Sequence, residues 1–158
     1  MALIERFQNT SDITHWRGQI PMNYVYTAGR GNDLLFKAIM EKGKFVGTRC
    51  DKCGIVYLPP RIYCERCFER IEANTVSVPN KGVIHTFTVC NETYNETIKA
   101  EPSIVALIRF EGTIGGLMHW IEGVAPEECY IGMPVKAVLK PKGKREGGIL
   151  DIECFKPA

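Results

Sequence analysis

The chain has 158 residues with 45% hydrophobic and 24% charged content, which excludes a disordered or fibrous protein and predicts one or two small globular units. Its formal net charge is +2, and its Lys and Arg residues are interleaved with Asp and Glu. A charge balance this close to neutral attracts polyanions only weakly, so composition gives little support to a nucleic-acid-binding role.

Hydropathy and cysteine usage predict the compartment. No run approaches the roughly 18 to 20 consecutive apolar residues of a membrane span, and the N-terminal stretch is too polar for a signal peptide. The chain has seven cysteines, and four of them form two Cys-x-x-Cys pairs. This odd number and this pairing favour metal binding in a reducing compartment over disulfides, and we expect a cytoplasmic protein.

Residues 1–44 are predicted to form an arm followed by one helix. Residues 1–31 show no clear periodicity, and they carry Trp16, Tyr24 and Tyr26 among Gly and Pro. After them, Asn32 or Asp33 can cap a helix that Gly43 ends. The apolar residues of this helix recur at helical spacing, namely Leu35, Phe36, Ile39 and Met40. Both the aromatic arm and the apolar helix face need a partner surface.

Residues 45–72 carry the two cysteine pairs and are predicted to be a zinc ribbon. Cys50 and Cys53 precede Gly54, and ten residues separate this pair from Cys64 and Cys67. Two such knuckles complete a tetrahedral shell of four thiolates, which leaves no open position for an activated water and so predicts a structural Zn²⁺. A rubredoxin-like iron site uses the same ligands and is the competing interpretation.

Residues 73–158 carry strand signals separated by Gly, Pro and Asn, at 75–78, 83–90, 103–110, 115–122, 135–139 and 149–155. The first two signals can form one strand that bends at residues 79–82, which gives five strands. A short helical segment is predicted at 126–130, between the third and fourth of these. The chain is therefore predicted to be mainly β with an N-terminal helix, a rubredoxin-like zinc ribbon and a five-stranded OB-fold barrel.

A recognisable catalytic set is missing from the sequence. Cys90, Cys129 and Cys154 fall on strands or beside a helix, where a thiol is usually buried and inert. His119 and Trp120 follow a run with two glycines that permits close backbone approach, although packing is the simpler interpretation. The basic cluster at 140–145 could meet phosphates or could simply be solvated.

The motifs, taken in order, resemble the zinc-ribbon and OB-fold proteins associated with acyl-coenzyme A enzymes, a former domain of unknown function. The resemblance rests on residues 26–29, 50–54, 59–61, 64–67, 82–88 and 131–135. It implies a non-catalytic, zinc-binding accessory subunit in a hetero-oligomeric complex. The partner would be a thiolase-like enzyme that cleaves or forms a carbon–carbon bond in an acyl-CoA thioester. The reactive residues would then belong to the partner subunit.

The resemblance also implies that the chain shares a CoA thioester ligand with its partner. The polar loop at 91–101 carries Tyr94 and Lys99, which could meet the adenine by stacking and the phosphates by charge. The full set of candidate CoA or partner contacts is Tyr94, Lys99, His119, Trp120, Trp16, Tyr24 and Tyr26.

Two other functions remain open from the sequence. Zinc ribbons and OB-folds both serve proteins that bind single-stranded nucleic acid, which requires a basic groove with exposed aromatic residues. A stand-alone enzyme would require His119 or Cys90 to carry the activity.

Overall fold

The computed structural model describes residues 26–92 and 98–158, and the side chains of 98–100 are outside this description. The elements in chain order are α1 (Gly29–Lys42), β1 (Phe45–Arg49), β2 (Val56–Leu58), β3 (Thr75–Val78), β4 (Lys81–Glu92), β5 (Ile98–Arg109), β6 (Ile114–Gly115), β7 (Leu117–Ile121), η2 (Pro126–Glu128), β8 (Pro134–Leu139), η3 (Lys142–Lys144), η4 (Ile149–Asp151) and β9 (Ile152–Pro157). Within the described residues, no helix is long and apolar enough to span a membrane.

The predicted helix is present, but it begins earlier than the sequence suggested. Its N-cap is Ala28, which makes no side-chain capping bond, so neither Asn32 nor Asp33 caps it. Asp33 instead pairs with Lys37 one turn later, at 2.8 Å. The helix ends as predicted at Gly43, whose φ of 63° is left-handed and suits a residue without a side chain.

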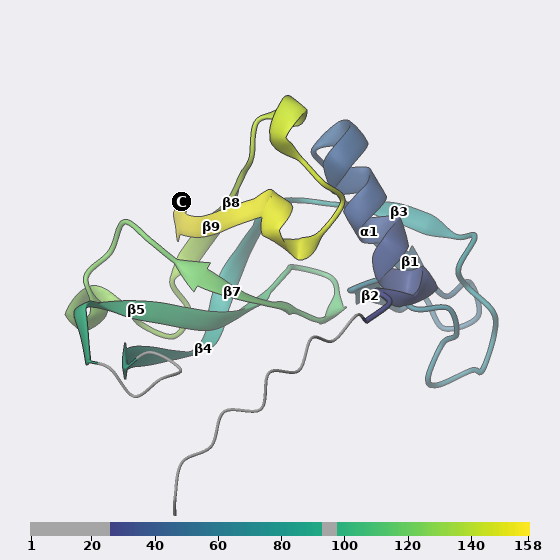
Figure 1. The fold of residues 1–158 in the computed structure, drawn as a ribbon. Helices are drawn as coiled ribbons and strands as arrows, with labels where there is room; N and C mark the ends of the chain where they lie inside the picture. Colours follow the sequence, from purple (N-terminus) through teal and green to yellow (C-terminus); the bar gives the residue numbers. More distant parts are fainter. Residues whose placement is uncertain (1–25, 93–97) are drawn as a thin grey trace, which may run out of the picture.

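The apolar face of α1 is covered by the rest of the chain. Leu35 and Ile39 are fully buried, and α1 lies against β1 and the η4 turn (Figure 1). The helix face that the sequence left without a partner therefore packs inside the protein at Leu35 and Ile39, and its other two residues, Phe36 and Met40, are half-buried.

A small sheet of order β3-β1-β2-β6 holds the cysteine pairs, and most of it is antiparallel. The segment at 75–78 pairs with β1 in this sheet, so the prediction that it continues into the first barrel strand is wrong. Residues Pro79 and Asn80 separate β3 from β4, and the two strands belong to different sheets. The short strand β6 adds to β2 in parallel and so ties the barrel to the cysteine-bearing sheet.

The predicted five-stranded barrel is confirmed, with strand order β4-β5-β7-β9-β8 and closure between β4 and β8. The 3-10 turn η2 lies between the third and fourth barrel strands, as the OB order requires. The start of the last predicted strand is instead the turn η4, and β9 begins at Ile152.

One hydrophobic core joins the helix, the ribbon sheet and the barrel. At its centre, Phe45 of β1 contacts Phe110 and Phe155 edge to face, with ring centroids 5.7 Å and 6.5 Å away. Because Phe155 belongs to β9, this cluster packs the ribbon directly against the barrel. The two parts therefore hold each other in place.

The basic cluster at 140–145 contributes to this packing through Arg145. Its guanidinium donates hydrogen bonds to the carbonyls of Ile39, at 3.0 Å, and Lys140, at 2.7 Å. The Ile39 carbonyl lies in the last turns of α1 and also accepts from Gly43 N–H at 2.9 Å, and a cation there complements the helix dipole. Arg145 is thus a helix cap and does not serve as a free phosphate ligand.

Candidate functional site

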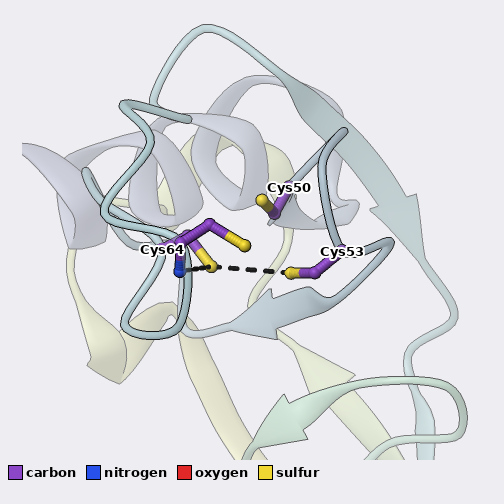
Figure 2. Close-up of side chains that lie close together, drawn as sticks. Cys50, Cys53 and Cys64 are labelled. Atoms are coloured by element: carbon purple, nitrogen blue, oxygen red, sulfur yellow. Dashed lines mark hydrogen bonds between the residues drawn. The ribbon is translucent and has the colours of Figure 1, made fainter.

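The four cysteines of the two knuckles come together as predicted. Their sulfur atoms all lie within 4.8 Å of one another, and Figure 2 shows the side chains of Cys50, Cys53 and Cys64 turned toward a common point. The two knuckles have the same backbone hydrogen bond, from Gly54 N–H to Cys50 O at 2.8 Å and from Phe68 N–H to Cys64 O at 2.9 Å. This turn directs both thiols of each knuckle to one side.

The sulfur cluster fits a tetrahedral metal site. Zn–S bonds of about 2.3 Å place the sulfurs of such a site roughly 3.8 Å apart, and the Sγ atoms of Cys53 and Cys64 are 3.6 Å apart. Cys50 and Cys64 are fully buried, while Cys53 and Cys67 are half-buried. Four sulfur ligands fill the coordination shell, so this site can fasten the chain but offers no position for a substrate.

Tyr57 of β2 is the immediate neighbour of the sulfur cluster. Its hydroxyl lies 3.3 Å from Cys64 Sγ, and the residue is fully buried. In the metal-free chain this hydrogen bond lowers the pKa of Cys64 to about 6, and it raises the pKa of Tyr57 to about 12. Both directions mean that the phenol donates to the thiolate, which stabilises the charged form that a metal requires.

The other cysteines of the cluster respond to burial and to each other. A hydrogen bond with Cys53, together with burial, raises the pKa of Cys67 to about 12. Burial also raises the pKa of Cys50. Cys64 therefore ionises more easily than Cys50 or Cys67 in the metal-free cluster.

The backbone around the cluster is fixed by Thr48 and Arg61. The buried Thr48 hydroxyl donates to Arg61 O at 3.0 Å and accepts from Arg61 N–H at 2.8 Å. The Arg61 guanidinium lies over the Tyr57 ring, 4.9 Å from its centroid. These contacts join β1 to the loop between the knuckles and hold the tyrosine in position.

The side chains of His119 and Trp120 lie on opposite faces of β7, although the sequence pointed to them as one candidate region. His119 points into the barrel, where it is 6% exposed and its Nδ1 has no hydrogen-bond partner. Burial lowers the pKa of His119, so its ring is neutral at pH 7. Trp120 points outward on the same strand and is 43% exposed.

The remaining candidate contacts fall at the edge of the described residues or beyond it. Tyr26 precedes α1 and is 81% exposed. Lys99 lies in β5, but its side chain is outside the described part. Trp16, Tyr24 and Tyr94 lie outside the described residues altogether. Their roles as contacts stay predictions.

The two buried cysteines outside the cluster, Cys129 and Cys154, are not activated. Burial raises the pKa of Cys129, and burial with the neighbouring Glu122 raises the pKa of Cys154 to about 11. Both thiols are therefore protonated and enclosed at neutral pH, and Cys90 is half-buried on β4. A raised pKa is the opposite of what a nucleophilic cysteine requires.

A second surface, which the sequence analysis missed, lies on the outside of the barrel. Its residues alternate with buried ones along β5 and β7 and lie opposite them on β4. We name the set the outer OB face: Thr86, Thr88, Val105, Leu107, Met118 and Trp120. Val105 lies opposite Trp120 and Leu107 opposite Met118. A hollow of about 160 Å³ lies between these strands. The signal in the sequence is that β5 and β7 are apolar at both alternating positions.

The fold and the sulfur site define a zinc-ribbon and OB-fold protein. Among protein-family models, the rubredoxin-like zinc ribbon domain of ChsH2 matches residues 41–72, and the C-terminal OB-fold domain of ChsH2 matches residues 75–140. A DUF35 domain-containing scaffold protein from Methanocaldococcus jannaschii is 31% identical over 105 residues, which cover 66% of this chain and 74% of the relative. The chain therefore belongs to the DUF35 family of zinc-ribbon and OB-fold proteins.

Other relatives agree with this assignment. A DUF35 domain-containing scaffold protein from Methanothermobacter thermautotrophicus is 27% identical over 124 residues, covering 77% of this chain and 92% of the relative. A probable enoyl-CoA hydratase alpha subunit from Thermomonospora curvata is 30% identical over 107 residues, covering 67% of this chain but only 32% of that protein.

Two solved structures share the fold. A crystal structure of a DUF35-family protein from Sulfolobus solfataricus aligns with a TM-score of 0.60 and 32% identity, covering 73% of this chain and 81% of the other. A structure described as an Ltp2-ChsH2(DUF35) aldolase aligns with a TM-score of 0.59 and 24% identity, covering 88% and 98%.

Proposed function

We propose that this chain is a non-catalytic scaffold subunit of an acyl-CoA enzyme complex, with a thiolase-like partner that cleaves or forms a carbon–carbon bond in an acyl-CoA thioester. The observation that carries the proposal is the relationship to DUF35 domain-containing scaffold proteins, one of which is 31% identical. The names of two further similar proteins support separate parts of the proposal. A probable enoyl-CoA hydratase alpha subunit supports an acyl-CoA enzyme as the partner, and an aldolase that contains a DUF35 chain supports carbon–carbon bond chemistry.

The described side chains support a role without catalysis. The sulfur cluster has four ligands and so no open position. The thiols of Cys129 and Cys154 are buried and protonated, and His119 is enclosed in the barrel. In this part of the chain, no activated nucleophile lies beside a base at the surface. The chemistry of the complex would then belong to the partner.

The proposed ion is Zn²⁺, held by Cys50, Cys53, Cys64 and Cys67. When bound, it would supply cross-linking of the two knuckles and no reaction step. The chain's own residues prepare this site, since Tyr57 donates to Cys64 and Thr48 fixes the loop that carries the second knuckle.

A shared CoA ligand remains part of the proposal. In the sequence, Tyr94 falls between β4 and β5, and Lys99 is the second residue of β5. The tyrosine ring would stack on the adenine of CoA, and the lysine would pair with its phosphates. Alanine at both positions is expected to reduce turnover of a CoA thioester by the complex. Unchanged turnover would remove these residues from the proposal.

The experiment that tests the scaffold role is mass spectrometry of the proteins that co-purify with a tagged copy in its native host. We expect a thiolase-like chain in near-equal amount at moderate salt. Recovery of nucleic acid instead would favour a single-stranded nucleic-acid-binding protein. The outer OB face does not support that alternative, because its six residues include no Lys or Arg. Proteins that bind single-stranded nucleic acid line their binding groove with cations.

A further inference from the structure

The two knuckles differ at one position that their backbone makes equivalent. In each, the residue four places after the first cysteine donates its N–H to that cysteine's carbonyl, and the cysteine N–H in turn donates to the carbonyl of the fifth residue. Gly54 occupies this position in the first knuckle, with φ of 74°. Phe68 occupies it in the second knuckle, with φ of 56°. Among the described residues, Phe68 is the sole non-glycine residue with positive φ.

A phenylalanine at this position is unfavourable for folding. The left-handed region brings Cβ close to the following carbonyl, so glycine is the preferred residue there. An aromatic side chain can offset such strain when it is buried, but Phe68 is 82% exposed. The exposed ring therefore contributes little burial to offset the backbone strain. A strained residue that does not stabilise the fold points to a function in binding.

A second exposed ring stands at the other end of the same knuckle. Tyr63 immediately precedes Cys64, is 55% exposed, and bridges to Arg70 across the loop. The knuckle thus presents an aromatic residue on each side of its cysteines. Two exposed rings on a metal-fastened turn form a rigid apolar projection.

Most charges around this projection are paired within the chain, and the exposed Arg66 is the exception among the described residues of the knuckle. Glu65 forms an ion pair with Arg61, and Lys52 forms one with Glu69 at 2.5 Å. Arg70 and Arg30 both contact Glu72. Binding to a nucleic acid or an anionic membrane requires cations that are free to meet phosphates. Paired charges around exposed rings are instead suited to a protein surface with an apolar pocket and a polar rim.

We propose that Phe68, together with Tyr63, is the anchor by which the second knuckle inserts into an apolar pocket of the partner acyl-CoA enzyme subunit. This inference rests on the proposed scaffold function and assigns the surface that performs it. A metal bound by Cys64 and Cys67 would fix the turn that carries Phe68, so the ring would project from the ribbon in the same position before and after binding. A preorganised aromatic anchor loses little conformational freedom on binding.

The test exploits opposite effects on folding and on binding. Phe68→Gly removes the ring and relieves the strained φ, so the melting temperature of the full-length, metal-loaded chain is expected to stay the same or rise. The dissociation constant for the separately purified thiolase-like subunit, measured by calorimetry, is expected to rise at least about tenfold. Tyr130→Ala is the matched control, because Tyr130 is 56% exposed but lies in the β7–β8 connection of the barrel.

Each other outcome decides against the anchor. Unchanged affinity of Phe68→Gly, or an equal loss in Tyr130→Ala, would overturn the assignment to this knuckle. A lower zinc content or melting temperature in Phe68→Gly would mean that the ring is structural. A wild-type dimer that depends on Phe68, or oligonucleotide binding that depends on it, would assign the anchor to another partner. Failure of the wild-type chain to bind a thiolase-like subunit would instead refute the proposed function itself.

Discussion

Replacing Tyr57 by Phe removes one hydroxyl beside the sulfur cluster and changes little else. The hydroxyl lies 3.3 Å from Cys64 Sγ, and both residues are fully buried, so water cannot substitute for the lost donor. Hydrogen bonds to charged groups contribute about 1.5 to 3 kcal/mol. The loss of a partner that hydrogen-bonds a metal ligand commonly reduces metal affinity about 10- to 100-fold, which is about 1.4 to 2.8 kcal/mol. The two ranges agree, and we expect zinc affinity to fall by this factor.

The measurement is competition for zinc with a chromogenic chelator at pH 7 under reducing conditions, with bound metal counted by mass spectrometry. Tyr63→Phe is the control, because this neighbouring tyrosine is 55% exposed and water can make any hydrogen bond that its hydroxyl would lose. We expect one zinc per chain in all three proteins when metal is in excess. Equal zinc affinity of Tyr57→Phe and the wild type would refute the idea that the phenol stabilises the Cys64 thiolate.

Three further predictions concern stability, measured by chemical denaturation. Arg145→Met should cost about 1.5 to 3 kcal/mol because it removes the charged hydrogen bonds to the carbonyls of Ile39 and Lys140, whereas the exposed Lys144→Met should cost little. Burial alone raises the pKa of Asp151, but backbone N–H donors outweigh it and hold the pKa below 3.8. Its stabilisation is therefore present above that pH and lost as pH falls through the folded pKa; Asp151→Asn should lose about 2 kcal/mol at pH 7 and approach the wild type in acid. Gly115→Ala should lose at least about 2 kcal/mol, because its Cβ would lie 2.3 Å from a carbonyl of β2 at φ of 104°, and Gly112→Ala, with no atom within 4 Å, should lose less.

The sequence could predict the sulfur site because its determinants are local. Each knuckle is a short turn closed by its own backbone hydrogen bonds, so the spacing of Cys50 and Cys53 is enough to place both thiols on one ion. The barrel strands were predictable for a similar reason, since each is a short apolar run bounded by Gly, Pro or Asn, and that signal lies within the strand and its own ends. Gly43 ended the helix as expected because its left-handed φ is a property of one residue.

The remaining features depend on contacts between distant segments. Arg145 and the helix carbonyl that it caps are 106 residues apart, and no local pattern marks that pairing. The segment at 75–78 has strand character in either sheet, and only pairing with β1 decides that it joins the ribbon. Phe68 is different, because its signal was available: aligning the two knuckles places this residue where the first has Gly54.

The shared core gives the scaffold proposal a physical basis. A scaffold must hold what it binds at a fixed separation, and two domains joined only by a flexible linker would not do so. Here Phe45 of the ribbon packs against both Phe110 and Phe155 of the barrel, and β6 adds a backbone connection to β2. The second knuckle and the outer OB face are therefore parts of one rigid body. Phe45→Ala would loosen this core and leave the four metal-binding cysteines in place. We expect it to weaken assembly of a complex that uses both surfaces, although Phe45 belongs to neither surface.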